Sequence, residues 1–176
     1  MMRGMMEIKL AQHLARLLIL GLCICCSAQA VKRQGTPPRY EDYAVAKIFK
    51  GKPARPLISN PQARAFRTRL REGAAKGPNF AGHYPIVTWG CGTGCQQMAV
   101  VDAQTGRVYF PKALSTLTYN LVENIEDAGI KYRLNSRLLV LVGSPGEEAE
   151  AANTVGTFYY KWENNDFKLV HAVKKK

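Results

Sequence analysis

The sequence has few cysteines and histidines, and this scarcity excludes several kinds of site. Five of its 176 residues are Cys and three are His, and four of these eight lie within the first thirty residues. The rest of the chain contains only Cys91, Cys95, His83 and His171. A four-ligand zinc site would use every one of them. A thioredoxin-like redox motif would need C-x-x-C, where this sequence has C-x3-C. The composition therefore predicts neither a metal nor a cofactor.

A hydrophobic run long enough to span a membrane is also lacking. The run LLILGLCICC has ten residues and is bounded by Arg16 and Ser27, whereas a transmembrane helix needs about 20 apolar residues. Basic residues precede it, and Ala28, Gln29 and Ala30 follow as an A-x-A cleavage signature. The sequence predicts a signal peptide at residues 1–30. The mature protein is then expected to be periplasmic or extracellular, and not an integral membrane protein.

Acidic residues are scarce in the first part of the mature chain. Residues 31–76 hold twelve Lys and Arg against three Asp and Glu, whereas residues 77–173 hold seven against nine, and the chain ends in three lysines. Such asymmetry indicates an anionic partner. Outside the cytoplasm, anionic lipid or an acidic envelope polymer is expected rather than nucleic acid. The alternative is that the charge serves only solubility.

The stretch CGTGC, between HYPIVTW and QQMAVVD, has the pattern of a β-hairpin with a three-residue loop. Gly94 suits the positive φ that such a loop needs near its end. Cys91 and Cys95 would face each other across the first rung, and an oxidising compartment favours a disulfide between them. The same register places Val87 opposite Ala99 and His83 opposite Ala103. Both faces of the hairpin are then largely apolar, which predicts a central position in the sheet.

The same stretch also allows more specific functional interpretations. A Cys-His dyad or a zinc site is disfavoured, because eight residues of strand separate His83 from Cys91 by about 26 Å. His83 is expected near Asp102, where a carboxylate or carbonyl would satisfy its ring. One alternative is a small hydrolase or transferase with a cleft lined by His83, Asp102 and an aromatic residue, Tyr84 or Tyr160. Another is a secreted inhibitor or immunity-like protein that uses the loop at residues 91–95.

A helix is predicted after Asn60, which suits the N-cap, with Pro61 at the first helical position. Either Gly73 or Gly77 is placed to end it. One apolar stripe has helical spacing and is expected to pack on the sheet; it consists of Ala63, Phe66, Leu70 and Ala74. Beside the stripe, Arg64, Arg67 and Arg71 form a basic row, the candidate anion-binding residues.

Further strand pairs are predicted from IKYRL with RLLVLVG and from TFYYKW with FKLVHAV. The expected fold is a single α+β domain, mainly an antiparallel sheet of six or seven strands with one main helix packed on it. Residues 31–42 are predicted to be a flexible basic leader, residues 43–173 the domain and residues 174–176 a basic tail. Residues 111–129 are expected to be a loop with a helical turn.

The blocks GPNFAGHYPIVTWGCGTGC, VVDAQTGRVY, LNSRLLVLVG and YYKWENNDFKLV resemble a family of small exported bacterial proteins of uncharacterised function. The resemblance extends from about Tyr43 to Val170. It implies export and a single domain, and it implies no particular chemistry. Pro85 stands where the pattern has a more strand-compatible residue, so regular pairing is not expected there. Taken together, the sequence favours a non-catalytic envelope or binding protein with a basic helix surface.

Overall fold

The structure is a computed structural model, and it describes residues 35–119, 122, 126–146 and 154–174. The predicted signal peptide, residues 1–30, lies outside the described residues, as do Lys175 and Lys176 of the predicted basic tail. Residues 37–176 form one compact unit. Every element described below belongs to this unit.

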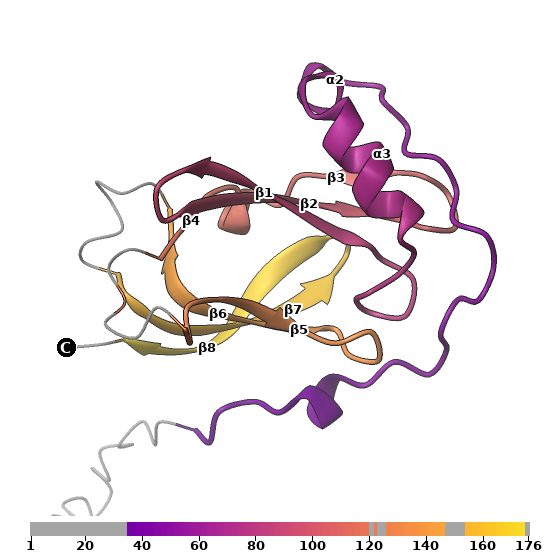
Figure 1. Ribbon diagram of the computed structural model, residues 1–176. Coiled ribbons are helices and arrows are strands. Elements are labelled where there is room, and N and C mark those ends of the chain that lie inside the picture. The colour runs from indigo at the N-terminus through magenta and orange to yellow at the C-terminus, as the bar shows by residue number, and fades with distance from the viewer. Residues whose placement is uncertain (1–34, 120–121, 123–125, 147–153, 175–176) are drawn as a thin grey trace, which may run out of the picture. The chain divides into compact units, whose positions relative to one another are not determined.

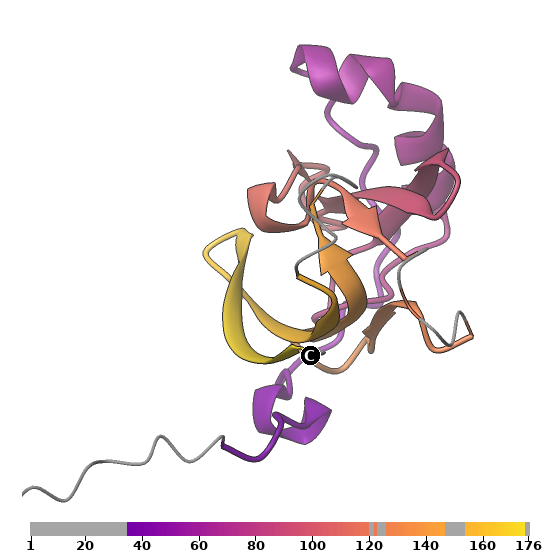
Figure 2. The same ribbon diagram turned by 90° about the vertical axis from the view of Figure 1, so that its left-hand side faces the viewer.

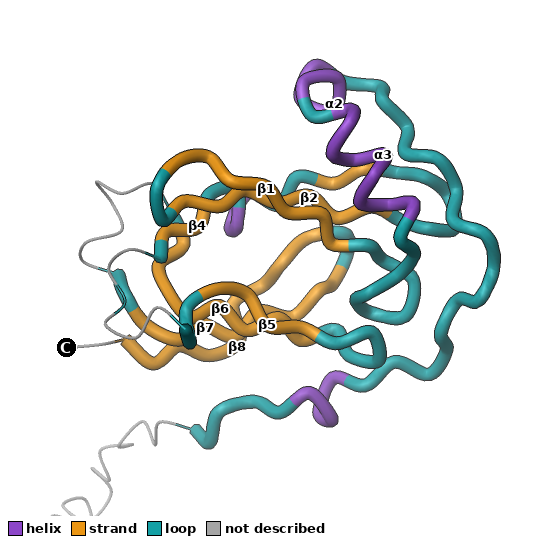
Figure 3. Tube along the Cα trace, viewed as in Figure 1, coloured by secondary structure: helices purple, strands orange, loops and turns teal. Residues whose placement is uncertain are grey.

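The described residues form an antiparallel sheet and one interrupted helix, which confirms the predicted α+β class (Figures 1 and 3). The strands are β1 (Ile86–Gly92), β2 (Cys95–Val101), β3 (Val108–Tyr109), β4 (Leu117–Thr118), β5 (Gly129–Tyr132), β6 (Leu138–Pro145), β7 (Gly156–Glu163) and β8 (Asp166–Lys174). The helices are α2 (Pro61–Ala65) and α3 (Arg67–Ala75), with single 3-10 turns at Tyr40–Tyr43 and Lys112–Leu114. The eight strands of the described chain exceed the expected six or seven, because β3 and β4 have only two residues each.

The strand order is β1-β2-β4-β6-β7-β8, with β3 beside β2 and β5 beside β6. The short strand β4 joins the two halves, because Thr118 pairs with Cys95 on one side and with Ser144 on the other. It lies in the segment 111–129, which the sequence predicts to be a loop. The views in Figures 1 and 2 show that the sheet curls, so that β1 and β2 lie over β6, β7 and β8.

Most of the β1–β2 hairpin is buried on both faces, as its sequence predicts, but β1 is an edge strand and Thr88 on it is exposed, so the expected central position in the sheet is wrong for this strand. Side chains of one face join the core between the two halves of the sheet, where Met98 and Val100 share a cluster with Phe158 and Trp162. Those of the other face pack beneath the helix; they are Val87, Trp89, Ala99 and Val101. Because side chains alternate along a strand, one register accounts for both clusters.

The helix begins as predicted, since the Asn60 side chain accepts a hydrogen bond from the amide of Ala63 at 2.7 Å. Phe66, at φ −106° and ψ 17°, interrupts it between α2 and α3. The predicted apolar stripe faces the sheet, and the Phe66 ring lies 4.4 Å from that of Trp89. Figure 1 shows α3 lying across β1 and β2.

Residues 45–57, called the strap below, run across the domain to the helix and are held by backbone hydrogen bonds. Amides of the strap donate to carbonyls of three other segments: Val45 to Asn135, Phe49 to Gly82, Ala54 to Ala103 and Leu57 to Gly106, at 2.7 to 3.0 Å. Gly82 has φ +84°, and a Cβ there would lie 2.5 Å from the carbonyl oxygen of Lys47. This close approach requires glycine.

The chain is ordered slightly before the predicted domain boundary at Tyr43. The Ser136 hydroxyl donates to the carbonyl of Tyr40 at 2.8 Å, and the Arg133 guanidinium lies 4.3 Å from the centre of the Tyr40 ring. Arg133 also forms an ion pair with Glu41. Residues 40–42, predicted to belong to the flexible leader, therefore pack on the domain.

Candidate functional site

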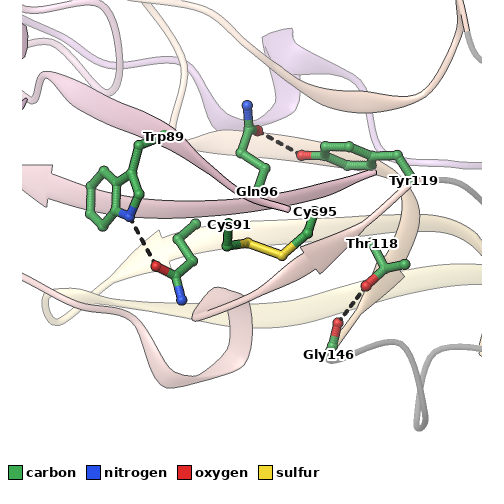
Figure 4. Close-up of a disulfide and its surroundings, with 8 residues drawn as sticks. Trp89, Cys91, Cys95, Gln96, Thr118, Tyr119 and Gly146 are labelled. Carbon is green, nitrogen blue, oxygen red and sulfur yellow. Dashed lines mark hydrogen bonds between the residues drawn. A yellow bond between two sulfur atoms is a disulfide. The ribbon is translucent and has the colours of Figure 1, made fainter. Parts of the chain in front are cut away.

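The hairpin end contains the predicted Cys91–Cys95 disulfide, with Cα atoms 5.2 Å apart (Figure 4). The predicted register holds from Ile86 to Gly90, and a bulge then places Gly92 opposite Cys95. Gly94 has the expected positive φ, +65°. In this bonded form neither sulfur is free to act as a nucleophile or a zinc ligand.

Side chains around the disulfide brace the tip on one side. The Tyr119 hydroxyl donates to Gln96 Oε1 at 2.7 Å (Figure 4). The Tyr119 amide donates to the carbonyl of Gly94 at 2.7 Å. The Trp89 indole donates to Gln97 Oε1 at 2.9 Å. Strand β4 therefore supports the base of the loop. The inhibitor-like use of this loop stays a prediction.

His83 lies in a groove of about 1000 Å³. Its ring is partly exposed and stacks on Tyr84, with centroids 4.0 Å apart and planes inclined by 35°. Within the described residues, neither ring nitrogen of His83 takes part in a hydrogen bond or ion pair. The ring is therefore available to a ligand in the groove.

Asp102 does not supply the partner that the sequence predicts for His83. The backbone register is as expected, because the Ala103 amide donates to the carbonyl of His83 at 3.0 Å. The Asp102 carboxylate, however, accepts from the amides of Gln104 at 2.7 Å and Thr105 at 3.2 Å. It is 8 % exposed and stabilises its own turn. The expected satisfaction of the His83 ring by this carboxylate is thus wrong.

The two aromatic candidates for the cleft differ in position. Tyr84 lines the groove, and burial raises the pKa of its phenol. A hydrogen bond with Trp162 opposes this rise in pKa, and the charge of Asp102 adds to it. Tyr160 is instead a core residue at 4 % exposure and does not line the groove. The phenol of Tyr84 is therefore neutral and able to donate a hydrogen bond at physiological pH.

A second pocket, of about 650 Å³, lies between the strap and α3. Three cations line it, Lys52 and Arg55 from the strap and Arg71 from the helix, and no acidic residue does. Within the described residues, none of the three forms an ion pair or a side-chain hydrogen bond. These residues and that pocket are called the basic pocket below.

The predicted row of arginines is only partly brought together at this pocket. Arg71 lines it, whereas Arg64 and Arg67 are exposed on the preceding turns, where Arg67 donates to the carbonyl of Arg64 at 3.4 Å. The sequence places Lys52 and Arg55 in the same basic part of the chain as Arg71, but it does not predict that the three line one pocket. Arg55, the strap cation nearest to Arg71 in the sequence, precedes it by 16 residues. No local sequence pattern shows that the strap returns to the helix.

In the described part of the chain, no three His, Cys, Asp or Glu side chains are grouped so as to hold a metal ion. Among the same residues, no helix combines the length and the hydropathy that crossing a bilayer requires.

Comparison of the chain with protein-family models, with curated proteins and with solved structures finds no match. The resemblance described above stays a prediction, and the function is argued from the geometry.

Proposed function

We propose that this protein is an exported, non-catalytic binding protein that attaches to anionic lipid headgroups through the basic pocket. The observation that carries the proposal is the convergence of Lys52, Arg55 and Arg71 on one concavity without an acidic residue. Like charges repel, so a site that gathers three of them is stabilised when an anion enters it.

The pocket is held in place before any ligand binds. Backbone hydrogen bonds fix Ala54 to Ala103 and Leu57 to Gly106, on either side of Arg55. Arg71 stands on a helix whose adjoining face is buried through Leu70 and Ala74. A preorganised site loses less entropy on binding than a flexible basic tail does. Near an anionic membrane, each basic residue contributes about 1 kcal/mol.

Two features favour a lipid surface over a soluble polymer. The Leu57 side chain is 51 % exposed and lies two residues from Arg55, and an apolar side chain gains free energy at a lipid interface but not on a hydrated polymer. Arg64 on α2 and Arg67 on α3 are exposed and extend the positive charge. An acidic envelope polymer is the competing partner.

The alternative of a small hydrolase or transferase at His83 has less support. The groove exists, but the Asp102 carboxylate is committed to backbone amides. A general base needs a group that orients it, and among the described residues none is hydrogen-bonded to the His83 ring.

Cosedimentation with vesicles tests the proposal. Wild-type protein is compared with an Arg64→Ala, Arg67→Ala, Arg71→Ala variant, using anionic and neutral vesicles at two salt concentrations. The wild type is expected to bind anionic vesicles only, more weakly at high salt, and the variant at least ten-fold more weakly. A matched control replaces three exposed cations outside the strap and helix, Arg107, Lys112 and Lys174. Equal loss in both variants, or binding indifferent to salt, contradicts the proposal. Tighter binding to soluble polyphosphate than to vesicles would assign the pocket to a polymer.

A further inference from the structure

The groove at His83 is assembled from segments far apart in the sequence. The strap forms one side, the turn at residues 80–84 carries His83, and the β7–β8 turn contributes Asn164 and Asn165. Gln104 and Arg137 come from two further loops. The groove shares no lining residue with the basic pocket. It is therefore a separate site.

Positive charge dominates the groove. Lys47, Lys50 and Arg137 line it, and within the described residues none of the three has an ion-pair partner. The one carboxylate of the lining, Glu163, is neutralised by Lys161 of its own strand and Lys168 of β8. The unpaired cations of the groove therefore favour a ligand that carries a carboxylate. The planar guanidinium of Arg137 has the best geometry for binding that carboxylate.

Three carboxamides supply the neutral hydrogen-bonding groups: Gln104, Asn164 and Asn165. All three are exposed, and their side chains have no hydrogen bond within the described residues. A carboxamide donates and accepts at the same time. Hydroxyl groups have the same dual character, so a ligand rich in hydroxyls would satisfy this set, whereas an aliphatic acid would leave it unused.

An aromatic surface completes the lining. The His83 and Tyr84 rings overlap at a 4.0 Å centroid separation, and the Trp162 ring meets Tyr84 edge-on at 5.4 Å. The stacked rings cover each other's facing sides, which leaves the outer side of the partly exposed His83 ring for the apolar C–H face of a pyranose, while the hydroxyls of the sugar point to the rim. The approach of the strap to Gly82 and the hydrogen bond from Phe49 hold the strap against the turn that carries His83.

From this combination we infer that the His83 groove binds an acidic saccharide, with its carboxylate at Arg137, its hydroxyls at the carboxamides and a ring face on His83. A volume of about 1000 Å³ is enough for a ligand of disaccharide size. The inference does not depend on headgroup binding at the basic pocket, because the two sites have no residue in common.

Titration of the full chain by calorimetry tests this site with three probes. Digalacturonate carries carboxylates and hydroxyls, cellobiose is a neutral disaccharide, and glutarate is an aliphatic dicarboxylate. Digalacturonate is expected to bind saturably, and the other two at least ten-fold more weakly. In NMR spectra, the side-chain amide signals of Gln104, Asn164 and Asn165 should shift with digalacturonate.

Substitutions locate the binding. Arg137→Gln is expected to weaken digalacturonate binding about ten-fold, because a charge-assisted hydrogen bond is lost. Gln104→Ala should weaken it about three-fold and serves as a second variant if Arg137→Gln fails to fold. Arg107→Gln, an exposed cation outside the groove, and Arg71→Gln at the basic pocket should each change it less than two-fold. Equal binding of all three probes, no saturable binding, or an unchanged affinity in Arg137→Gln and Gln104→Ala would overturn the inference.

Discussion

Asn79 and Ile86 are joined by a pair of hydrogen bonds. The Ile86 amide donates to Asn79 Oδ1 at 2.7 Å, and Asn79 Nδ2 donates to the carbonyl of Ile86 at 3.2 Å. The carboxamide thus occupies the place of a neighbouring strand at the first residue of β1, which is an edge strand. It satisfies backbone groups that would otherwise be unpaired in a partly buried position.

Replacement of Asn79 is expected to be costly for this reason. Asn79→Ala should lower the free energy of unfolding by about 2 kcal/mol, because a buried amide and carbonyl lose their partner. Urea unfolding monitored by Trp fluorescence measures the change. Thr88→Ala, at an exposed position of the same strand, should change it by less than about 0.5 kcal/mol. Similar values for both variants would show that the Asn79 bonds do not stabilise the edge.

Gly82 should tolerate no side chain. In Gly82→Ala, the Cβ would meet the Lys47 carbonyl, and φ +84° is strained for any L-residue, so a loss of more than about 2 kcal/mol is expected. Gly129→Ala provides the matched control, since Gly129 has φ +119° with nothing within 4 Å of its Cβ position. Because Gly82 approaches another segment and Gly129 does not, the excess loss in Gly82→Ala reports the contact. Equal losses would contradict the close approach of the strap.

The disulfide is expected to fix the hairpin turn rather than the whole fold. Cys91→Ser, Cys95→Ser protein should fold and lose about 2 kcal/mol, because the closed loop is short. Alkylation of the native protein should leave Cys91 and Cys95 unlabelled. Rapid labelling of both, or failure of the double variant to fold, would refute this role.

Tyr160 should make the protein sensitive to alkali. Burial raises the pKa of its phenol to about 12, while an unfolded chain titrates near about 10. The unfolded state then loses its proton first, so stability is unaffected below pH 10 and falls as the pH rises from about 10 to about 12. Tyr160→Phe removes this titrating group, so the loss in free energy of unfolding at high pH should be smaller by up to about 2 to 3 kcal/mol. Parallel stability curves for the two proteins above pH 10 would contradict the assignment.

Local pattern was sufficient for the helix and the hairpin. Asn60 and Pro61 identify the helix start, and the alternation along β1 and β2 predicts which side chains face the helix. The distribution of hydrophobic residues fixes the register, because a shift by one residue would exchange the two faces. The irregular pairing expected at Pro85 is wrong, because the Val101 amide donates to the carbonyl of Pro85 at 2.9 Å and the register of β1 continues to His83.

Other features depend on contacts that the spacing of residue types along the sequence does not reveal. Strand β4 has two residues and exists because β2 and β6 flank it. The strap has no repeating pattern, so its return past Gly82 and Arg71 was not predictable. The strand register predicted that the Asp102 carboxylate would accept a hydrogen bond from the His83 ring. Backbone amides of its own turn donate to this carboxylate instead. Loss of His83 is accordingly expected to cost only its ring contact with Tyr84, about 1 kcal/mol.

The central claim is that the position of the cations, and not their number, creates the binding site. Arg71→Gln and Arg69→Gln test it most directly, because they remove the same charge from α3 and only Arg71 lines the basic pocket. Association constants for anionic vesicles at physiological salt are compared. Arg71→Gln should bind about five-fold more weakly than wild type, and Arg69→Gln less than two-fold. Equal weakening in both variants, or none in Arg71→Gln, would contradict the account.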